Sequence, residues 1–180
     1  CRIKGLVQRV KELGQTAVAV TDHGNMFGAV DFFKEAKSQG IKPIIGCEVY
    51  VAAGSRFEKN NRGMYLLILL AENNQGYHNL MKIVSAGHVE GFYYKPRVDK
   101  DLLRQHHEGI ICLSGCLVGN VSRMILNADY YAARAEAEEL REIFGENNFF
   151  LEIQNHHLEE DKRVIEGLKR LNDETGILLV

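Results

Sequence analysis

The sequence has few of the features that mark disulfide-rich, membrane-spanning or strongly basic proteins. Its 180 residues include only four cysteines and two prolines. No stretch approaches the roughly 18 apolar residues of a membrane-spanning helix, and we recognise no signal peptide, so we expect no membrane partner. The formal net charge of −2 provides no general basic field. Any contact with DNA is therefore expected to be local or to come from another domain.

The cysteines Cys1, Cys47, Cys112 and Cys116 are too few to form a dense disulfide framework, so a reducing cytoplasm is the expected location. The chain begins at Cys1 and ends in the apolar run Ile177–Val180. We interpret it as part of a longer protein.

Apolar runs alternate with amphipathic segments along the whole chain. Strands are predicted at residues 16–21, 41–52, 64–71, 109–113, 149–154 and 177–180. Helices are predicted at residues 2–13, 26–39, 75–86, 129–144 and 158–175, with a shorter one to residue 107 that Asp99 caps. Such alternation predicts an α/β fold with a mostly parallel sheet and helical crossovers.

The pattern alone leaves an open doubly wound sheet and a closed barrel as alternatives. Polar residues recur at the ends of nearly all the predicted strands, which favours a barrel with one active face. The sequence contains no glycine-rich dinucleotide fingerprint and no phosphate-binding loop, which counts against a nucleotide-binding sheet.

Candidate metal ligands lie at the ends of four predicted strands. They are Asp22 with His23, then Glu48, Cys116 and His156. Imidazole, carboxylate and thiolate together suit zinc, manganese or iron better than magnesium. Each candidate has a structural alternative: a capping pair for Asp22 and His23, a salt bridge for Glu48, and a small buried side chain for Cys116.

Lys95 and Arg97 form a small basic cluster within the aromatic segment GFYYKPRVD, which is predicted to be irregular. The two side chains could bind a phosphate, or they could pair with carboxylates and hold the loop in place. Cys47 and Cys112 lie inside predicted strands and are expected to be core residues.

Five segments, in this order, carry a family resemblance: TDHGNMFGAVDFFKEAKSQGIKPIIGCEVYVA, GYHNL, EGFYYKPRVDKDLL, GIICLSGCL and FFLEIQNH. They resemble the N-terminal PHP (polymerase and histidinol phosphatase) domain of bacterial DNA polymerase III alpha subunits. The resemblance covers essentially all 180 residues. It implies a distorted seven-stranded β/α barrel of the TIM type, here without its first and last strands, with up to three metal ions at the carboxyl ends of the strands.

By this resemblance His23, Glu48 and Cys116 occupy metal-ligand positions, and zinc or manganese is expected there. Asp22 is expected to orient a ligand, and His156 to lie near the site. Leu66 stands where relatives often have a histidine, which implies a weakened metal cluster. The GFYYKPR and EIQNH segments favour the replicative polymerase over free-standing PHP phosphatases.

The resemblance implies a role in DNA replication. Polymerisation with magnesium, and binding of DNA and nucleotides, would belong to other domains of the protein. Its expected partners are holoenzyme subunits, among them the proofreading subunit and the sliding clamp. Two readings of this domain stay open: a metal-dependent 3′–5′ exonuclease, or a scaffold that braces the polymerase and docks a separate proofreading subunit. A free phosphatase is the third alternative.

Overall fold

A computed structural model describes residues 2–180 as an α/β structure of seven helices and six strands. The elements are α1 Ile3–Glu12, β1 Ala17–Val20, α2 Ala29–Ser38, β2 Lys42–Ala52, β3 Met64–Ala71, α3 Asn74–Val89, β4 Arg97–Val98, α4 Lys100–Gln105, β5 Ile110–Leu113, α5 Asn120–Leu126, α6 Tyr130–Phe144, β6 Phe149–Phe150 and α7 Glu159–Thr175. None of these helices, all within residues 2–180, is long and apolar enough to cross a lipid bilayer.

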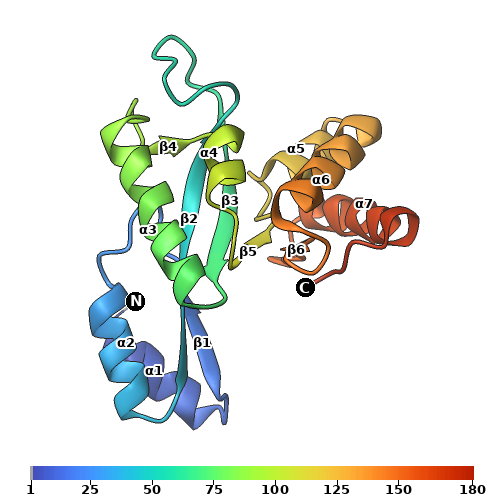
Figure 1. Cartoon of the computed structure of the whole chain (residues 1–180). Coiled ribbons are helices and arrows are strands. Elements are labelled where there is room, and N and C mark those ends of the chain that lie inside the picture. Colours follow the sequence, from blue (N-terminus) through green and yellow to red (C-terminus); the bar gives the residue numbers. More distant parts are fainter. Residues whose placement is uncertain (1) are drawn as a thin grey trace.

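The long strand β2 connects the parts of the sheet, whose order is β1-β2-β3-β5-β6 with β4 also paired to β2 (Figure 1). Its first half, residues 42–45, pairs parallel with β1. Its second half, residues 46–52, pairs antiparallel with β3. Figure 1 shows α1 and α2 beside β1 at one end of the molecule, and α5, α6 and α7 at the opposite side of the sheet.

The α/β class is confirmed, and the sheet is mixed: three strand pairs are parallel as predicted, whereas the two pairs that β3 makes are antiparallel. β3 runs antiparallel to both β2 and β5, and the parallel pairs are β1 with β2, β2 with β4, and β5 with β6. The physical reason lies in the connection over residues 53–63, which forms no helix. A connection without a crossover returns the chain as a hairpin, and a hairpin is antiparallel.

Most predicted elements are present, with changes at their ends. The third predicted strand matches β3 at both ends, and Asp99 and Asp129 cap α4 and α6 by accepting hydrogen bonds from the Leu102 and Ala132 amides. The strand predicted at 149–154 shortens to two residues, and the one at 177–180 reduces to a single bridge between Leu151 and Leu179. Strand β4 and helix α5 were not predicted.

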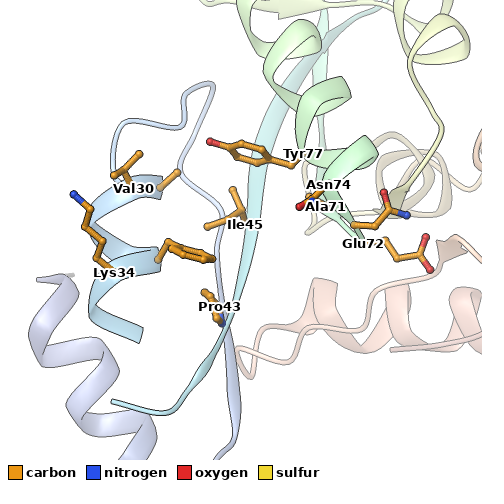
Figure 2. Close-up of a pocket in the computed structure, with 11 residues that line it drawn as sticks. Val30, Lys34, Pro43, Ile45, Ala71, Glu72, Asn74 and Tyr77 are labelled. Carbon is orange, nitrogen blue, oxygen red and sulfur yellow. The ribbon is translucent and has the colours of Figure 1, made fainter. Parts of the chain in front are cut away.

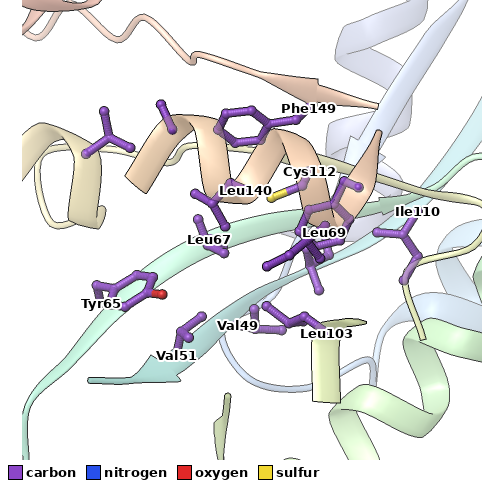
Figure 3. Packing of buried hydrophobic residues seen from close by; sticks show 14 of the residues in the cluster. Val49, Val51, Tyr65, Leu67, Leu69, Leu103, Ile110, Cys112, Leu140 and Phe149 are labelled. Carbon is purple, nitrogen blue, oxygen red and sulfur yellow. The ribbon is translucent and has the colours of Figure 1, made fainter. Parts of the chain in front are cut away.

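The two faces of the sheet differ in how well they are covered. Alternate residues of β2, β3 and β5 are buried beneath the helices and form the main core, part of which appears in Figure 3. They include Val49, Leu67, Leu69 and Cys112. The intervening residues, Glu48 among them, lie on the opposite face and are only partly buried. The period of two therefore puts the candidate site on the less covered face.

Candidate metal site

The structure brings two of the predicted ligands into direct contact. His23 lies three residues beyond the end of β1, and Glu48 lies within the neighbouring strand β2. The Nε2 atom of His23 is 3.1 Å from Oε2 of Glu48. The imidazole is 60% exposed, whereas the carboxylate is 14% exposed. The pair therefore offers one accessible nitrogen atom and one largely enclosed carboxylate as candidate ligands.

Backbone contacts hold the His23 loop against β2. Gly24 donates its amide hydrogen to the Glu48 carbonyl at 2.9 Å, and the Glu48 amide donates to the Asp22 carbonyl at 3.1 Å. Gly24 has a φ of +66°, and a Cβ atom there would come within 2.8 Å of the Pro96 side chain. Only glycine meets both demands without strain, so the local geometry requires glycine at position 24.

Burial and a neighbouring carboxylate both disfavour the ionised form of Glu48. Burial raises the pKa of Glu48 above its ordinary value, the imidazole of His23 opposes this shift, and the carboxylate of Glu152 adds to it. Two carboxylates close enough to affect each other's ionisation are unfavourable unless positive charge is supplied.

Glu152, two residues beyond β6, is a functional candidate that the sequence analysis missed. Its Oε1 atom accepts a hydrogen bond from Gln154 at 2.7 Å, whereas its Oε2 atom is buried without any partner. A signal was available, since Glu152 stands between apolar neighbours in FFLEIQNH as Glu48 does in its strand. An unpartnered buried carboxylate oxygen is costly, and a cation at this face of the sheet would satisfy it.

The available ligands fit a divalent cation in chemical type but do not yet enclose one. Within residues 2–180 no group of three or more His, Cys, Asp or Glu side chains is arranged to hold a metal ion. The contact between His23 and Glu48 therefore offers two candidate ligands, with Glu152 as an additional carboxylate whose charge affects Glu48.

Cys116 lies in the loop that follows β5, and its thiol is free and partly exposed. The adjacent Gly115 approaches the backbone of Leu66 so closely that a Cβ atom there would lie 3.1 Å from the Leu66 carbonyl oxygen. Leu66 pairs with Tyr50 in the sheet, two residues along β2 from Glu48. Cys116 follows strand β5, and Leu66 lies in the neighbouring strand β3. The loop that carries Cys116 therefore passes close to Leu66.

The other predicted residues have different surroundings. The Asp22 carboxylate lies beside Gly28 at the start of α2, where a Cβ atom would contact its Oδ2 at 3.4 Å. His156 lies in the loop before α7, with its ring 63% exposed and Nδ1 4.0 Å from Asp161. The same aspartate, in the first turn of α7, accepts hydrogen bonds from the amides of His156 and Leu158. The loop that carries His156 is therefore held against the N-terminus of α7.

The structure separates the basic pair. Arg97 is 1% exposed, and its guanidinium donates to the backbone carbonyls of Gly91, Asn61, Arg56 and Glu58. It holds loops in place through carbonyl groups rather than through carboxylates.

Lys95 is exposed, with its Nζ atom 5.4 Å from the centre of the Tyr50 ring. That ring in turn stacks 6.2 Å from the ring of His23. The ammonium group therefore lies at the rim of the site.

Two cysteines have the core positions that were expected. Cys47 and Cys112 are completely buried. Burial raises the pKa of Cys47 to about 12 and that of Cys112 well above its ordinary value. Both are therefore neutral thiols at physiological pH and contribute packing rather than ligation.

A separate pocket of about 510 Å³ lies between α2 and α3 (Figure 2). Figure 2 shows Val30 and Lys34 on one side, Tyr77 on the other, and Pro43 and Ile45 at its base. None of the candidate ligands lines it, so it is distinct from the site around Glu48.

Comparison with known proteins defines the class of protein. Residues 1–156 match the PHP domain family, and the chain belongs to it. The fold agrees, since an amidohydrolase from Chromobacterium violaceum superimposes with a TM-score of 0.53 at 13% sequence identity, over 98% of this chain and 79% of that protein.

The similar curated proteins are more specific. The chain is 49% identical over 182 residues to the DNA polymerase III subunit alpha of Treponema pallidum, and 45% identical over 186 residues to that of Thermus aquaticus. Each alignment covers 99% of this chain but only 16% and 15% of the relative. The resemblance inferred from the sequence is confirmed, and the chain spans about one sixth of the length of these relatives.

Proposed function

We propose that residues 1–180 are part of the PHP domain of a replicative DNA polymerase III alpha subunit, and that the face around Glu48 is a metal-dependent phosphodiesterase site with 3′–5′ exonuclease activity. The observation that carries this proposal is the His23–Glu48 contact beside the unpartnered carboxylate oxygen of Glu152. Free-standing phosphatase activity is disfavoured because the similar curated proteins are polymerase subunits.

The residues that would hold the metal are His23 and Glu48, which are in contact, and an imidazole with a carboxylate suits zinc or manganese. Cys116, the third predicted ligand, is not grouped with them within residues 2–180. A bound cation of this kind lowers the pKa of water and neutralises phosphate charge. Glu48 holds the imidazole of His23 in place, with 3.1 Å between Oε2 and Nε2. Glu152 adds a second negative charge near Glu48, which favours binding of a cation. The loop contacts of Gly24 keep the imidazole at the edge of β2.

Lys95 is the residue in this proposal that binds the substrate phosphate. Its ammonium group is exposed and lies over the Tyr50 ring. The Tyr50 ring in turn stacks on the imidazole of His23. A lysine in this position supplies a point charge to a phosphodiester that reaches the site. Arg97 has no part in substrate binding, because its donors are used by backbone carbonyls.

The remaining functions of the protein would belong to other parts of it. These are binding of DNA and nucleotides, polymerisation with magnesium, and contact with the proofreading subunit and the sliding clamp. Replication of this kind takes place in the cytoplasm of bacteria, which is the proposed location.

A scaffold role is the second candidate, favoured by one observation. Leu66 lies on the same face of the sheet as Glu48 and cannot ligate a metal, and residues 2–180 include no three-ligand cluster. In this alternative the domain supports the polymerase and the proofreading subunit without hydrolysing DNA.

The deciding experiment measures metal content and 3′–5′ exonuclease rate in the full-length protein and in its Glu48→Gln variant. We expect the variant to lose bound zinc or manganese and to lose hydrolysis together. Glu72→Gln is the matched control, because Glu72 is an exposed carboxylate beyond the end of β3. A wild-type protein with neither metal nor hydrolysis supports the scaffold, and hydrolysis that survives Glu48→Gln contradicts the proposed site.

A further inference from the structure

Three exposed aromatic side chains lie in two loops near the proposed site. Phe57 belongs to the β2–β3 loop, residues 53–63, and Phe92 and Tyr94 belong to the loop before β4, residues 91–96. Their exposed fractions are 58%, 55% and 58%. In Figure 1 the β2–β3 loop projects beyond the sheet on the side of β4. Exposed rings of this size usually have a binding role when they gather in one region.

Two cations of the β2–β3 loop contact the segment that precedes β4. Lys59 donates from Nζ to the carbonyls of Glu90 and Phe92 at 2.8 and 3.1 Å. The Arg62 guanidinium lies 4.0 Å from the centre of the Tyr94 ring and donates a hydrogen bond to its hydroxyl. We call Phe57, Phe92, Tyr94 and these two cations the aromatic–basic surface.

Tyr94 occupies an unfavourable backbone conformation. Its φ is +61°, in the left-handed region that bulky residues rarely adopt. The turn is closed by a hydrogen bond from the Tyr93 amide to the Lys95 carbonyl, and the Tyr93 ring supports Tyr94 edge-on at 4.8 Å. Glycine would form this turn without strain. Strain of this kind is retained where an exposed side chain has a use.

The charge of the region differs from that of the whole chain. Residues 53–63 and 91–97 contain five basic residues and one acidic residue, whereas the chain has a formal net charge of −2. The basic residues are Arg56, Lys59, Arg62, Lys95 and Arg97, and the acidic residue is Glu58. Arg97 is buried and Arg56 is paired with Glu90 and Asp99, so the exposed basic residues are Lys59, Arg62 and Lys95. A locally basic surface with interleaved aromatic rings is typical of binding to single-stranded nucleic acid.

The surface leads to the proposed site. Lys95 follows Tyr94 directly and lies over Tyr50, whose ring stacks on that of His23. A strand whose bases stack on the aromatic rings would therefore present its phosphodiester backbone to Lys95 and then to His23.

We propose that the aromatic–basic surface binds single-stranded nucleic acid, with a base stacked on the exposed face of Tyr94 while Arg62 supports the opposite face. The proposal rests on the proposed function for the site that the strand would reach. A peptide is less well matched, because rings interleaved with cations suit planar bases joined by phosphates.

The test is photo-crosslinking of the full-length protein to single-stranded oligothymidylate that carries 5-iododeoxyuridine, in the presence of EDTA. Iodouracil crosslinks efficiently to aromatic side chains stacked on it, and mass spectrometry identifies the residue. We expect a crosslink at Tyr94, and a loss of crosslinking in this loop of at least about fivefold in Tyr94→Ala. Tyr94→Phe should retain the crosslink, because stacking requires the ring and not the hydroxyl.

Tyr131→Ala is the matched control, because Tyr131 is 86% exposed on α6, away from both loops. Crosslinks to other residues with none at Tyr94 would overturn the proposal. EDTA removes hydrolysis from the measurement. A protein that crosslinks at Tyr94 yet hydrolyses nothing with zinc or manganese therefore refutes the exonuclease without refuting the surface.

Discussion

Replacing Arg97 with methionine should destabilise the domain strongly, because this buried guanidinium connects two loops, residues 53–63 and 91–96. It donates to the carbonyls of Asn61 at 2.7 Å and Glu58 at 2.5 Å, and to those of Gly91 and Arg56 at 3.3 and 3.4 Å. Methionine has a similar length but no donor, so all four carbonyls lose this partner.

The two short bonds determine the magnitude. A hydrogen bond from a charged donor contributes about 1.5–3 kcal/mol, so their loss should lower the free energy of unfolding by about 3–6 kcal/mol. The two longer bonds are weak and add little. Since folded domains are stable by about 5–15 kcal/mol, this is a large fraction of the total. The free energy of unfolding of Arg97→Lys should lie between those of Arg97→Met and the wild type, because one ammonium group cannot reach all four carbonyls.

Urea denaturation followed by circular dichroism measures the loss, and limited proteolysis of the full-length protein reports on residues 53–63. We expect this loop to be cleaved faster in Arg97→Met. Lys95→Met is the control, since its exposed side chain should change stability by about 0.5 kcal/mol or less. A loss below about 1 kcal/mol in Arg97→Met, with unchanged cleavage, would refute the reasoning and restore Arg97 as a candidate for binding phosphate.

Three further predictions concern stability and metal affinity. Burial raises the pKa of Glu139, but the hydrogen bond and charge of Lys100 outweigh this, so the folded-state pKa lies below the ordinary 4.5. Its contribution to the free energy of unfolding is therefore fully present above pH 4.5 and is lost as the pH falls through the folded-state pKa. Glu139→Gln should reduce the fall in unfolding free energy that is measured as the pH is lowered through this range. Gly76→Ala would place a Cβ atom 1.7 Å from a carbonyl oxygen before β5. It should therefore lower the denaturation midpoint sharply, whereas Gly5→Ala, with open space around it, should not. Leu66→His should increase zinc or manganese affinity about 10-fold or more, measured by calorimetry, and unchanged affinity would show that this position does not face the metal.

Much of the candidate site was predictable from local sequence. An apolar run followed by Asp22, His23 and Gly24 indicates a buried strand that ends in a polar turn. The structure has the strand and the turn, but β1 is only partly buried and its Ala19 is exposed, so the predicted burial is wrong. Glu48 stood out because a carboxylate within an apolar strand needs a partner, and that partner is His23. Glu152 offered the same signal and was overlooked. These features depend on the order of apolar and polar residues over a few neighbouring positions, and such local patterns can be read from the sequence.

The sequence by itself determined most of the segments that form helices and strands, as the agreement at β3 shows, although β4 and α5 carried no recognisable pattern. The tertiary structure alone decided the direction of that strand, because hairpin and crossover connections differ in how the chain returns and not in the pattern of the strand itself. It also decided the role of Arg97, whose four carbonyl partners are 6 to 41 residues away in the chain. Such contacts arise only when distant segments pack together, and no local pattern encodes them.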